Sequence, residues 1–183
     1  ERVVIEIDEN VVEASKTYLP FLSKAYEDER LNLIIGDAME FVKKPNENTY
    51  DLIIIDGPHS SGELSPLYSV EFFKQCNTLL SETGALIVQG ESPKFNEKAF
   101  QKIDTNLKWV FDGYRKFNML FNVPTFPSGI WSFQVILKSG ADPREVDPKK
   151  VKLFVSQYKT KYYNYATHMA AFAMPEYVKK MLN

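Results

Sequence analysis

Short apolar runs alternate with amphipathic stretches from residue 2 to about residue 106, and this alternation constrains the fold more than any other feature. The runs with strand character cover 2–8, 31–35, 50–55 and 85–89. The stretches with helical spacing cover 10–19, 39–43, 67–80 and 96–107. This order predicts an α/β fold with a doubly wound, mostly parallel sheet and helices on both faces. The run 50–55 is apolar at consecutive positions, which predicts burial on both faces of the sheet.

The pattern changes after Lys108. Strand-like segments follow at 109–114, 118–123 and 130–137, separated by residues that favour turns, such as Pro124 and Gly129. No long helix separates the last two segments, so we expect an antiparallel pair at one edge of the sheet. Helices are expected over 148–158, 165–172 and 175–182. Without an internal repeat or a linker, we interpret residues 1–183 as a single domain.

Composition excludes several classes of protein. The chain has 183 residues, of which 44% are hydrophobic and 25% charged, so an intrinsically disordered chain is excluded. A net charge of −2 gives no reason to expect nucleic acid as a partner. No apolar run approaches the roughly 20 residues that span a membrane. Cys76 has no partner for an internal disulfide, which favours a cytoplasmic location.

Acidic residues follow three of the expected strands. Glu6 and Asp8 end the first, Asp37 follows the second and Asp56 follows the third. In open parallel sheets ligands bind beyond the carboxyl ends of the strands, where a carboxylate can accept both hydroxyl protons of a ribose. Glu6 is our candidate for that role, and Asp37 with the small Ala38 is a candidate for contact with adenine. The alternative is that these acids cap helices or face water.

Two further segments contain candidate catalytic or binding residues. The loop 56–62 joins Asp56 to His59, whose imidazole can be neutral at pH 7 and act as a base; a surface histidine is the alternative. The segment 89–93 ends the fourth strand, and Glu91 there is either a partner for a cationic group or part of a turn. Six aromatic residues gather near the end of the chain, and we expect most of them in the core: Tyr158, Tyr162, Tyr163, Tyr165, Phe172 and Tyr177.

Seven blocks of this sequence resemble the spermidine synthases, in the family's order and spacing over essentially the whole chain. They are Glu6-Ile-Asp8 with Val11, Lys16 to Pro20, Gly36-Asp37, Tyr50 to Asp56, Gln89 to Pro93, Pro124 to Gly129 and Tyr162 to Pro175. The resemblance implies a Rossmann-like (class I methyltransferase-type) fold. It also implies transfer of the aminopropyl group of decarboxylated S-adenosylmethionine to putrescine, which gives spermidine and methylthioadenosine.

The resemblance also implies roles for individual residues. Glu6 would bind the ribose, Asp37 and Ala38 the adenine, Asp56 the amine region and Gln89 the substrate pocket. No prosthetic group or metal is implied, because decarboxylated S-adenosylmethionine is a co-substrate whose sulfonium already activates the carbon that is attacked. The implied partners are a small diamine and an adenosyl sulfonium in a cytoplasmic homodimer, without nucleic acid or membrane.

The sequence departs from the family pattern at two positions near the amine. His59 stands where the family has a second aspartate, the usual proton acceptor, so Asp56 and His59 are the catalytic candidates. Phe126 replaces the tyrosine of the Pro-Thr-Tyr-Pro-Ser-Gly block, which removes a hydroxyl from the substrate-binding side. Losing one hydrogen bond to a charged group costs about 1.5–3 kcal/mol. Recognition of putrescine is therefore the property most affected.

The family also has a β-rich N-terminal domain, a central strand and a glycine-rich loop before the acid at Glu6. None of these precedes Glu6 here, which predicts a fragment, or one part of a longer chain, with two interior strand edges left unpaired. Two other functions stay open. One is a weakly active or inactive paralogue that serves as a binding or regulatory subunit. The other is an N-methyltransferase on the same scaffold, for which no basic partner of the donor carboxyl group is evident.

Overall fold

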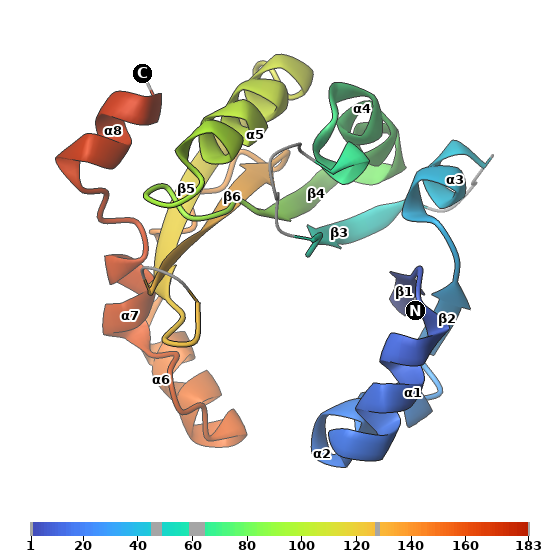
Figure 1. Ribbon diagram of the computed structural model, residues 1–183. Helices are drawn as coiled ribbons and strands as arrows, with labels where there is room; N and C mark the ends of the chain where they lie inside the picture. Colours follow the sequence, from blue (N-terminus) through green and yellow to red (C-terminus); the bar gives the residue numbers. More distant parts are fainter. Residues whose placement is uncertain (1, 45–48, 59–64, 127–128, 183) are drawn as a thin grey trace. The chain divides into compact units, whose positions relative to one another are not determined.

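The computed structural model describes residues 2–44, 49–58, 65–126 and 129–182, which form two compact units (Figure 1). The first unit comprises residues 1–47 and the second residues 48–183. Each unit has its own sheet, and each is described by itself below. The organisation as a single domain stays a prediction. Among the described residues, no helix is long and apolar enough to cross a membrane.

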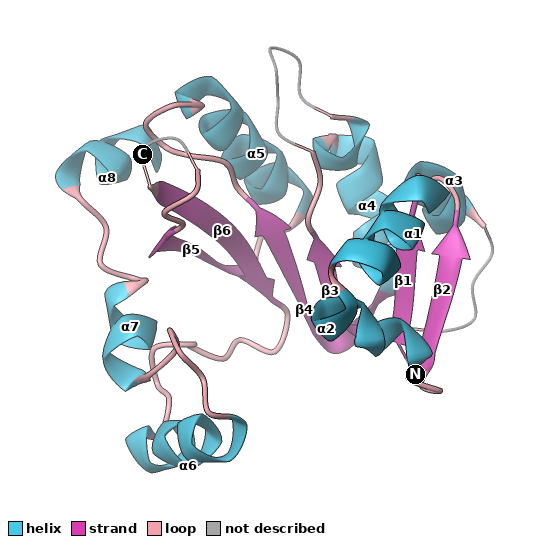
Figure 2. Ribbon diagram, turned by 60° about the horizontal axis from the view of Figure 1, so that its bottom comes forward, coloured by secondary structure: helices cyan, strands magenta, loops and turns pink. Residues whose placement is uncertain are grey.

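The first unit is built on two parallel strands. Its elements are β1 (Arg2–Glu6), α1 (Glu9–Tyr18), α2 (Pro20–Ser23), η1 (Lys24–Glu27), β2 (Leu31–Ile35) and α3 (Ala38–Lys43). The strands pair in register from Arg2 opposite Leu31 to Glu6 opposite Ile35. Figure 2 shows α1 next to this strand pair. The predicted strand–helix alternation is confirmed here.

The second unit contains a four-stranded sheet in the order β3-β4-β6-β5. Its strands are β3 (Tyr50–Ile55), β4 (Leu80–Gln89), β5 (Arg115–Asn122) and β6 (Ile130–Leu137). The pair β3–β4 is parallel, whereas β4–β6 and β5–β6 are antiparallel. The predicted antiparallel pair at the sheet edge is therefore confirmed, with β5 as the edge strand.

The helices of this unit cover both faces of its sheet unevenly. They are η2 (Pro66–Tyr68), α4 (Val70–Leu79), α5 (Glu97–Val110), α6 (Pro148–Tyr158), α7 (Tyr165–Ala170) and α8 (Glu176–Leu182). Helices α4 and α5 lie side by side on one face (Figure 1). Their fully buried side chains, which include Phe73, Phe100 and Ile103, form the main core with Leu86 of β4. On the other face, Phe117 of β5 meets Phe172, which follows α7, with ring centroids 6.3 Å apart.

The prediction that β3 is buried on both faces is wrong for the described residues. Ile55 is buried, but Leu52 is 49% exposed and Ile54 is 61% exposed. Leu52 and Ile54 point to the same face because strand side chains alternate. Helices α4 and α5 cover only the opposite face of this sheet. Among the described residues, β3 pairs with β4 alone and β1 with β2 alone.

Two predicted boundaries also need correction. The segment 109–114 is not a strand, because α5 continues to Val110 and a turn follows. Leu107 and Phe111 extend the buried helical face, and Gly113, at φ 84°, allows the left-handed turn that follows. Strand β4 starts at Leu80, earlier than the predicted start at residue 85, and its register with β3 shifts between the pairs Tyr50–Leu80 and Leu52–Ala85.

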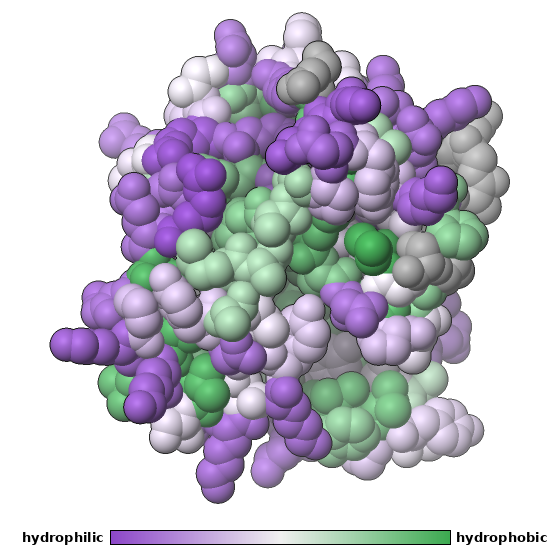
Figure 3. Space-filling view, turned by 90° about the vertical axis from the view of Figure 1, so that its left-hand side faces the viewer, coloured by the Kyte–Doolittle hydropathy of each residue, from purple (hydrophilic) through white to green (hydrophobic). Residues whose placement is uncertain are grey.

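The aromatic residues near the chain end are not mostly in the core. Tyr158 is 61% exposed and Tyr162 58%, and Tyr165 and Tyr177 are also exposed. Figure 3 views the face that carries α6, α7 and α8 and shows apolar side chains gathered among hydrophilic ones. These rings lie at the ends of the tail helices or between them: Tyr158 ends α6, Tyr162 lies between α6 and α7, and Tyr165 begins α7.

Candidate functional site

The candidate adenosine-binding residues lie together at the carboxyl ends of β1 and β2. Because the strands are parallel neighbours, the N–H of Gly36 donates to the carbonyl oxygen of Glu6 at 2.8 Å. Asp37 and Ala38 follow Gly36 directly and begin α3. The structure thus places Glu6, Asp37 and Ala38 at one edge of the first unit, as expected from the strand register.

The carboxylates at this edge also have local structural roles. Oδ1 of Asp37 accepts from the N–H of Met39 at 2.8 Å and caps α3. Oδ1 of Asp8 caps α1 in the same way, through the N–H of Asn10 at 2.9 Å. Oε1 of Glu6 accepts from the N–H of Asp8 at 3.0 Å. Helix capping is therefore real for Asp8 and Asp37, and each of these bonds uses only one of the two carboxylate oxygens.

The candidate amine-binding residues Asp56 and Gln89 lie at the carboxyl ends of β3 and β4. Ile55 is opposite Val88, so the next residues, Asp56 and Gln89, leave the sheet at the same edge. Asp56 is exposed, while Gln89 is buried. His59 lies outside the described residues, and its role as a base stays a prediction.

A turn with an unusual backbone follows Gln89. Glu91 is fully buried and has φ 66°, a conformation that L side chains rarely adopt. Its carbonyl oxygen accepts from the hydroxyl of Ser132 at 2.7 Å, and its Oε2 accepts from Nδ2 of Asn96 at 2.5 Å. A buried carboxylate held by hydrogen bonds on a strained backbone is a feature that concentrates at functional sites.

Tyr68 connects the two strand ends of this unit. Its hydroxyl donates to Oε1 of Gln89 at 3.3 Å, and the phenol also lies against the backbone of Gly57. Burial, and next the charges of Glu91 and Asp56, raise the pKa of Tyr68 well above its usual value. The hydroxyl therefore keeps its proton at any physiological pH and acts as a hydrogen-bond donor.

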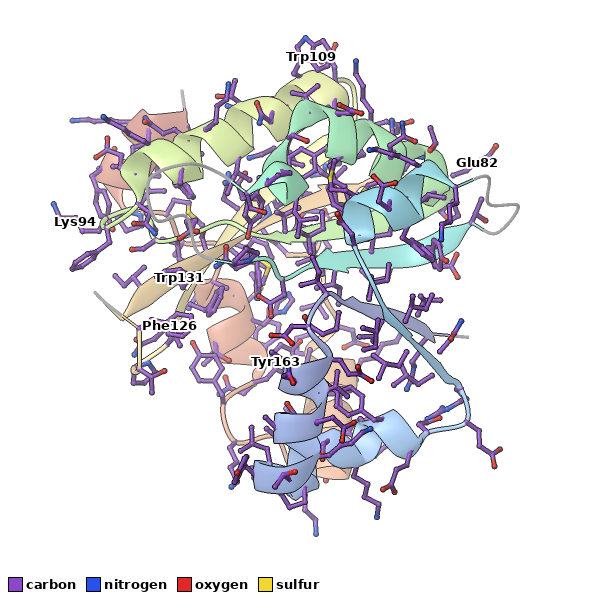
Figure 4. The ribbon with its side chains drawn as sticks, turned by 45° about the vertical axis from the view of Figure 1, so that its right-hand side comes forward. Glu82, Lys94, Trp109, Phe126, Trp131 and Tyr163 are labelled. Atoms are coloured by element: carbon purple, nitrogen blue, oxygen red, sulfur yellow. The ribbon has the colours of Figure 1, made fainter. Side chains whose placement is uncertain are left out.

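Phe126 lies in the turn between β5 and β6. Its ring packs edge-on against Trp131 with centroids 4.9 Å apart, and Figure 4 shows the two labelled side chains together. Trp131 precedes Ser132, the residue that holds the Glu91 carbonyl. The turn that bears Phe126 is thus connected to the end of β4 through two successive residues of β6.

Other reactive groups do not form a site in the described part of the chain. No cluster of three or more metal-ligating side chains occurs there. Cys76 is buried in α4, and burial raises the pKa of its thiol to about 12, so it is a poor nucleophile.

Sequence reasoning missed Tyr68, Asn96 and Ser132 as parts of this site. Each meets the Gln89–Glu91 turn only in the folded chain, from 5 to 41 residues away in sequence. One local signal was present, namely a glycine between two polar residues at a strand end. A Cβ on Gly90 would lie 2.6 Å from Oγ of Ser132, so the close approach of β6 requires glycine there.

Comparison with known proteins identifies the family. The model of the spermine/spermidine synthase domain matches residues 1–150. The chain belongs to this family. A polyamine aminopropyltransferase of Caldicellulosiruptor saccharolyticus is 37% identical over 179 residues, which cover 98% of this chain and 62% of that protein. The enzyme of the same name from Clostridium botulinum is 40% identical over 187 residues, with the same coverage.

Solved structures agree with this membership and with the Rossmann-like fold. The spermidine synthase from Thermotoga maritima matches with a TM-score of 0.84 at 32% identity, over 98% of this chain and 59% of that one. A spermidine synthase in complex with the transition-state analogue AdoDATO matches with a TM-score of 0.83 at 32% identity, over 98% and 58%. The chain spans about three fifths of the length of these relatives.

Proposed function

We propose that this chain is the Rossmann-like part of an aminopropyltransferase that converts putrescine and decarboxylated S-adenosylmethionine into spermidine and methylthioadenosine. Membership of the family and the names of the relatives support transfer of an aminopropyl group to a polyamine. The similarity to a structure that holds AdoDATO supports an adenosyl donor. The observation that carries the proposal is the pair of polar strand ends, Glu6 with Asp37 in one unit and Asp56 with Gln89 in the other.

The chemistry requires a proton acceptor and little else. The alkylammonium group of the diamine must first lose a proton, because its nitrogen otherwise has no lone pair. The free amine then attacks the carbon next to the sulfonium. The C–N bond forms as the C–S bond breaks, and the electron pair of the C–S bond stays on sulfur, which becomes a neutral thioether. The products are a secondary ammonium ion, methylthioadenosine and the proton taken up by the base.

The residues are assigned to this reaction as follows. The second oxygen of Glu6 binds the ribose, and Asp37 with Ala38 contacts the adenine. Asp56 attracts the ammonium and, with His59, takes its proton. Gln89 and Phe126 belong to the amine side of the pocket, where Phe126 offers an apolar ring instead of a hydroxyl. The contact of Phe126 with Trp131 supports an apolar binding surface for the alkyl chain of the amine.

The test uses the intact protein with decarboxylated S-adenosylmethionine and putrescine, and measures release of methylthioadenosine by liquid chromatography. We expect turnover by the wild type and a loss of about 10²–10⁴-fold in kcat for Asp56→Asn. The matched control is Asp51→Asn, the same change at an exposed aspartate within β3. Asp51 lies near the opposite end of β3, where its Oδ1 accepts from the hydroxyl of Ser81 at 3.2 Å. We expect the control to keep kcat within about twofold, since surface changes have small effects.

A lack of activity would favour a role as a binding or regulatory subunit. No methylthioadenosine from the wild type, combined with binding of AdoDATO, would indicate a catalytically inactive binding or regulatory subunit. The observation that favours this second function is the ring of Phe126, which packs on Trp131 and has no hydroxyl to bind an amine. Equal effects of Asp56→Asn and Asp51→Asn would remove Asp56 from the mechanism.

The remaining properties belong to the same proposal. We expect no prosthetic group, a cytoplasmic homodimer, and a small diamine and adenosyl sulfonium as the only ligands of the site. Sedimentation of the intact protein measures the oligomeric state, and a monomer at assay concentration would contradict the homodimer.

A further inference from the structure

The orientation of the Gln89 amide follows from its neighbours. The N–H of Glu91 lies 3.2 Å from the side-chain Oε1 of Gln89, and a backbone N–H can only donate. The atom that faces it must therefore be the carbonyl oxygen of the amide and not the NH2 group. This contact fixes Oε1 toward the turn and leaves Nε2 as the end that serves other partners.

The hydroxyl of Tyr68 then has one possible direction. It lies 3.3 Å from the same Oε1, so it must donate its proton to Gln89. Its oxygen also lies against the backbone of Gly57, the residue that follows Asp56. Two donors, the hydroxyl of Tyr68 and the N–H of Glu91, thus meet at Oε1 of Gln89.

Tyr68 itself is rigidly held. Its side chain is fully buried, and its carbonyl oxygen accepts from Nδ2 of Asn106 in α5 at 2.9 Å. Serine caps flank it on both sides, with Ser65 at the start of η2 and Ser69 at the start of α4. Space is also restricted, because a Cβ on Gly57 would lie 2.9 Å from the hydroxyl oxygen. The phenol can therefore transmit its position to both strand ends.

We propose that Tyr68 is a positioning residue of the transferase site, which acts by fixing the Gln89 amide and by joining the loop that carries Asp56 to the end of β4. This proposal rests on the proposed function for its effect on turnover. Removing the hydroxyl takes one of these two donors from Oε1 of Gln89 and opens the close contact with Gly57. The amide is then held less firmly, and the loop next to Asp56 loses its contact with the phenol oxygen.

The kinetic test combines Tyr68→Phe with Gln89→Leu in the intact protein. We expect Tyr68→Phe to lower kcat about tenfold in the wild-type background, equivalent to about 1.4 kcal/mol, with little change in KM for the adenosyl donor. In the Gln89→Leu background the same change should lower kcat less than about twofold, because the amide that it positions is gone. The matched control is Tyr114→Phe, which removes a hydroxyl from a partly exposed ring near Phe111.

A second measurement does not depend on activity. Hydrogen exchange of the backbone N–H of Glu91 reports how firmly the Gln89 amide is held, because that N–H donates to the same Oε1. We expect Tyr68→Phe to speed the exchange of Glu91 at least tenfold, and Tyr114→Phe to leave it unchanged. If the wild type releases no methylthioadenosine, the proposed function fails while this exchange result still decides whether Tyr68 holds the Gln89 amide. Unchanged exchange, or an equal loss of kcat with and without Gln89, overturns the proposal for Tyr68.

Discussion

Gly90 gives the sharpest prediction about the candidate amine site, because steric contact alone makes glycine necessary there. Gly90 is absent from the glycines with positive φ, so an alanine can adopt its backbone conformation. A Cβ at this position would nevertheless lie 2.6 Å from Oγ of Ser132 and 2.9 Å from Cγ of Gln134. Gly90→Ala therefore forces buried atoms of β6 to move.

The expected cost follows from what must move. Overpacking of a buried position costs about 1–3 kcal/mol. Displacing the Ser132 hydroxyl also breaks its 2.7 Å bond to the Glu91 carbonyl, worth about 1 kcal/mol. Restricting the unfolded chain returns about 0.4–1 kcal/mol. We expect Gly90→Ala to lower the free energy of unfolding by about 1–3.5 kcal/mol, and to lower kcat because the Gln89–Glu91 turn shifts.

Ser132→Ala tests this reasoning as a partner change. Alone it should cost about 1–2 kcal/mol, since it removes the donor from a buried carbonyl. In the double variant the new methyl group no longer meets the hydroxyl. The double variant should therefore lose about 1 kcal/mol less free energy of unfolding than the sum of the losses in the two single variants. Urea unfolding of the intact protein measures all four free energies. Gly36→Ala is the control, because no described atom lies within 4 Å of the added Cβ.

Additive costs would refute the steric argument, because they would show that the Ser132 hydroxyl is not the obstacle. A stability equal to that of the wild type in Gly90→Ala would refute it more directly. The backbone of the turn would then have room to accommodate a side chain.

Two further predictions concern the charged residues of the second unit. Asp104 and Lys116 form a buried ion pair between α5 and β5, so Asp104→Asn should lower the free energy of unfolding by about 3–5 kcal/mol. Adding Lys116→Met should restore part of that free energy. Urea unfolding of both variants measures the two values, and no recovery in the double variant would contradict the pairing. Hydrogen bonds from Arg144, and then from Arg115, lower the pKa of Asp142, so its contribution to stability is present above the unfolded-state pKa of about 3.9 and is lost as the pH falls through the lower folded-state value. Asp142→Asn should therefore flatten the acid side of the stability profile, and an unchanged profile from urea midpoints at several pH values would show that the carboxylate contributes nothing.

Sequence periodicity predicted most elements because each strand has a short apolar run and each long helix a regular buried face. It failed at 109–114, where aromatic and β-branched residues end a helix and have the same composition as a strand. It failed again for the exposed face of β3, since apolar side chains predict a covered face without showing which described element covers it. The ends of the tail helices were close, but the exposure of Tyr158 and Tyr162 depends on tertiary contacts that periodicity does not contain.

The candidate site divides in the same way. The positions of Glu6 and Asp37 were predictable, because parallel neighbours bring their carboxyl ends to one edge. The same register argument places Asp56 beside Gln89. The contact of Tyr68 with Gln89 was not predictable, since it joins a short 3₁₀ turn to a strand end 21 residues later. No local pattern encodes a hydrogen bond of that kind.

The orientation of Gln89 also narrows the choice of proton acceptor. An alkylammonium has only donors, and the NH2 end of Gln89 is a donor as well, so that end of the amide cannot accept the proton of the substrate. Two carboxylates lie near Tyr68 at the ends of β3 and β4. Glu91 is fully buried and accepts from Asn96, whereas Asp56 is exposed at the strand end. An incoming diamine can reach Asp56 without desolvating a closed turn. We therefore expect Asp56, and not Glu91, to attract the ammonium, and the amide of Gln89 to orient an acceptor such as a carboxylate or a water molecule beside it.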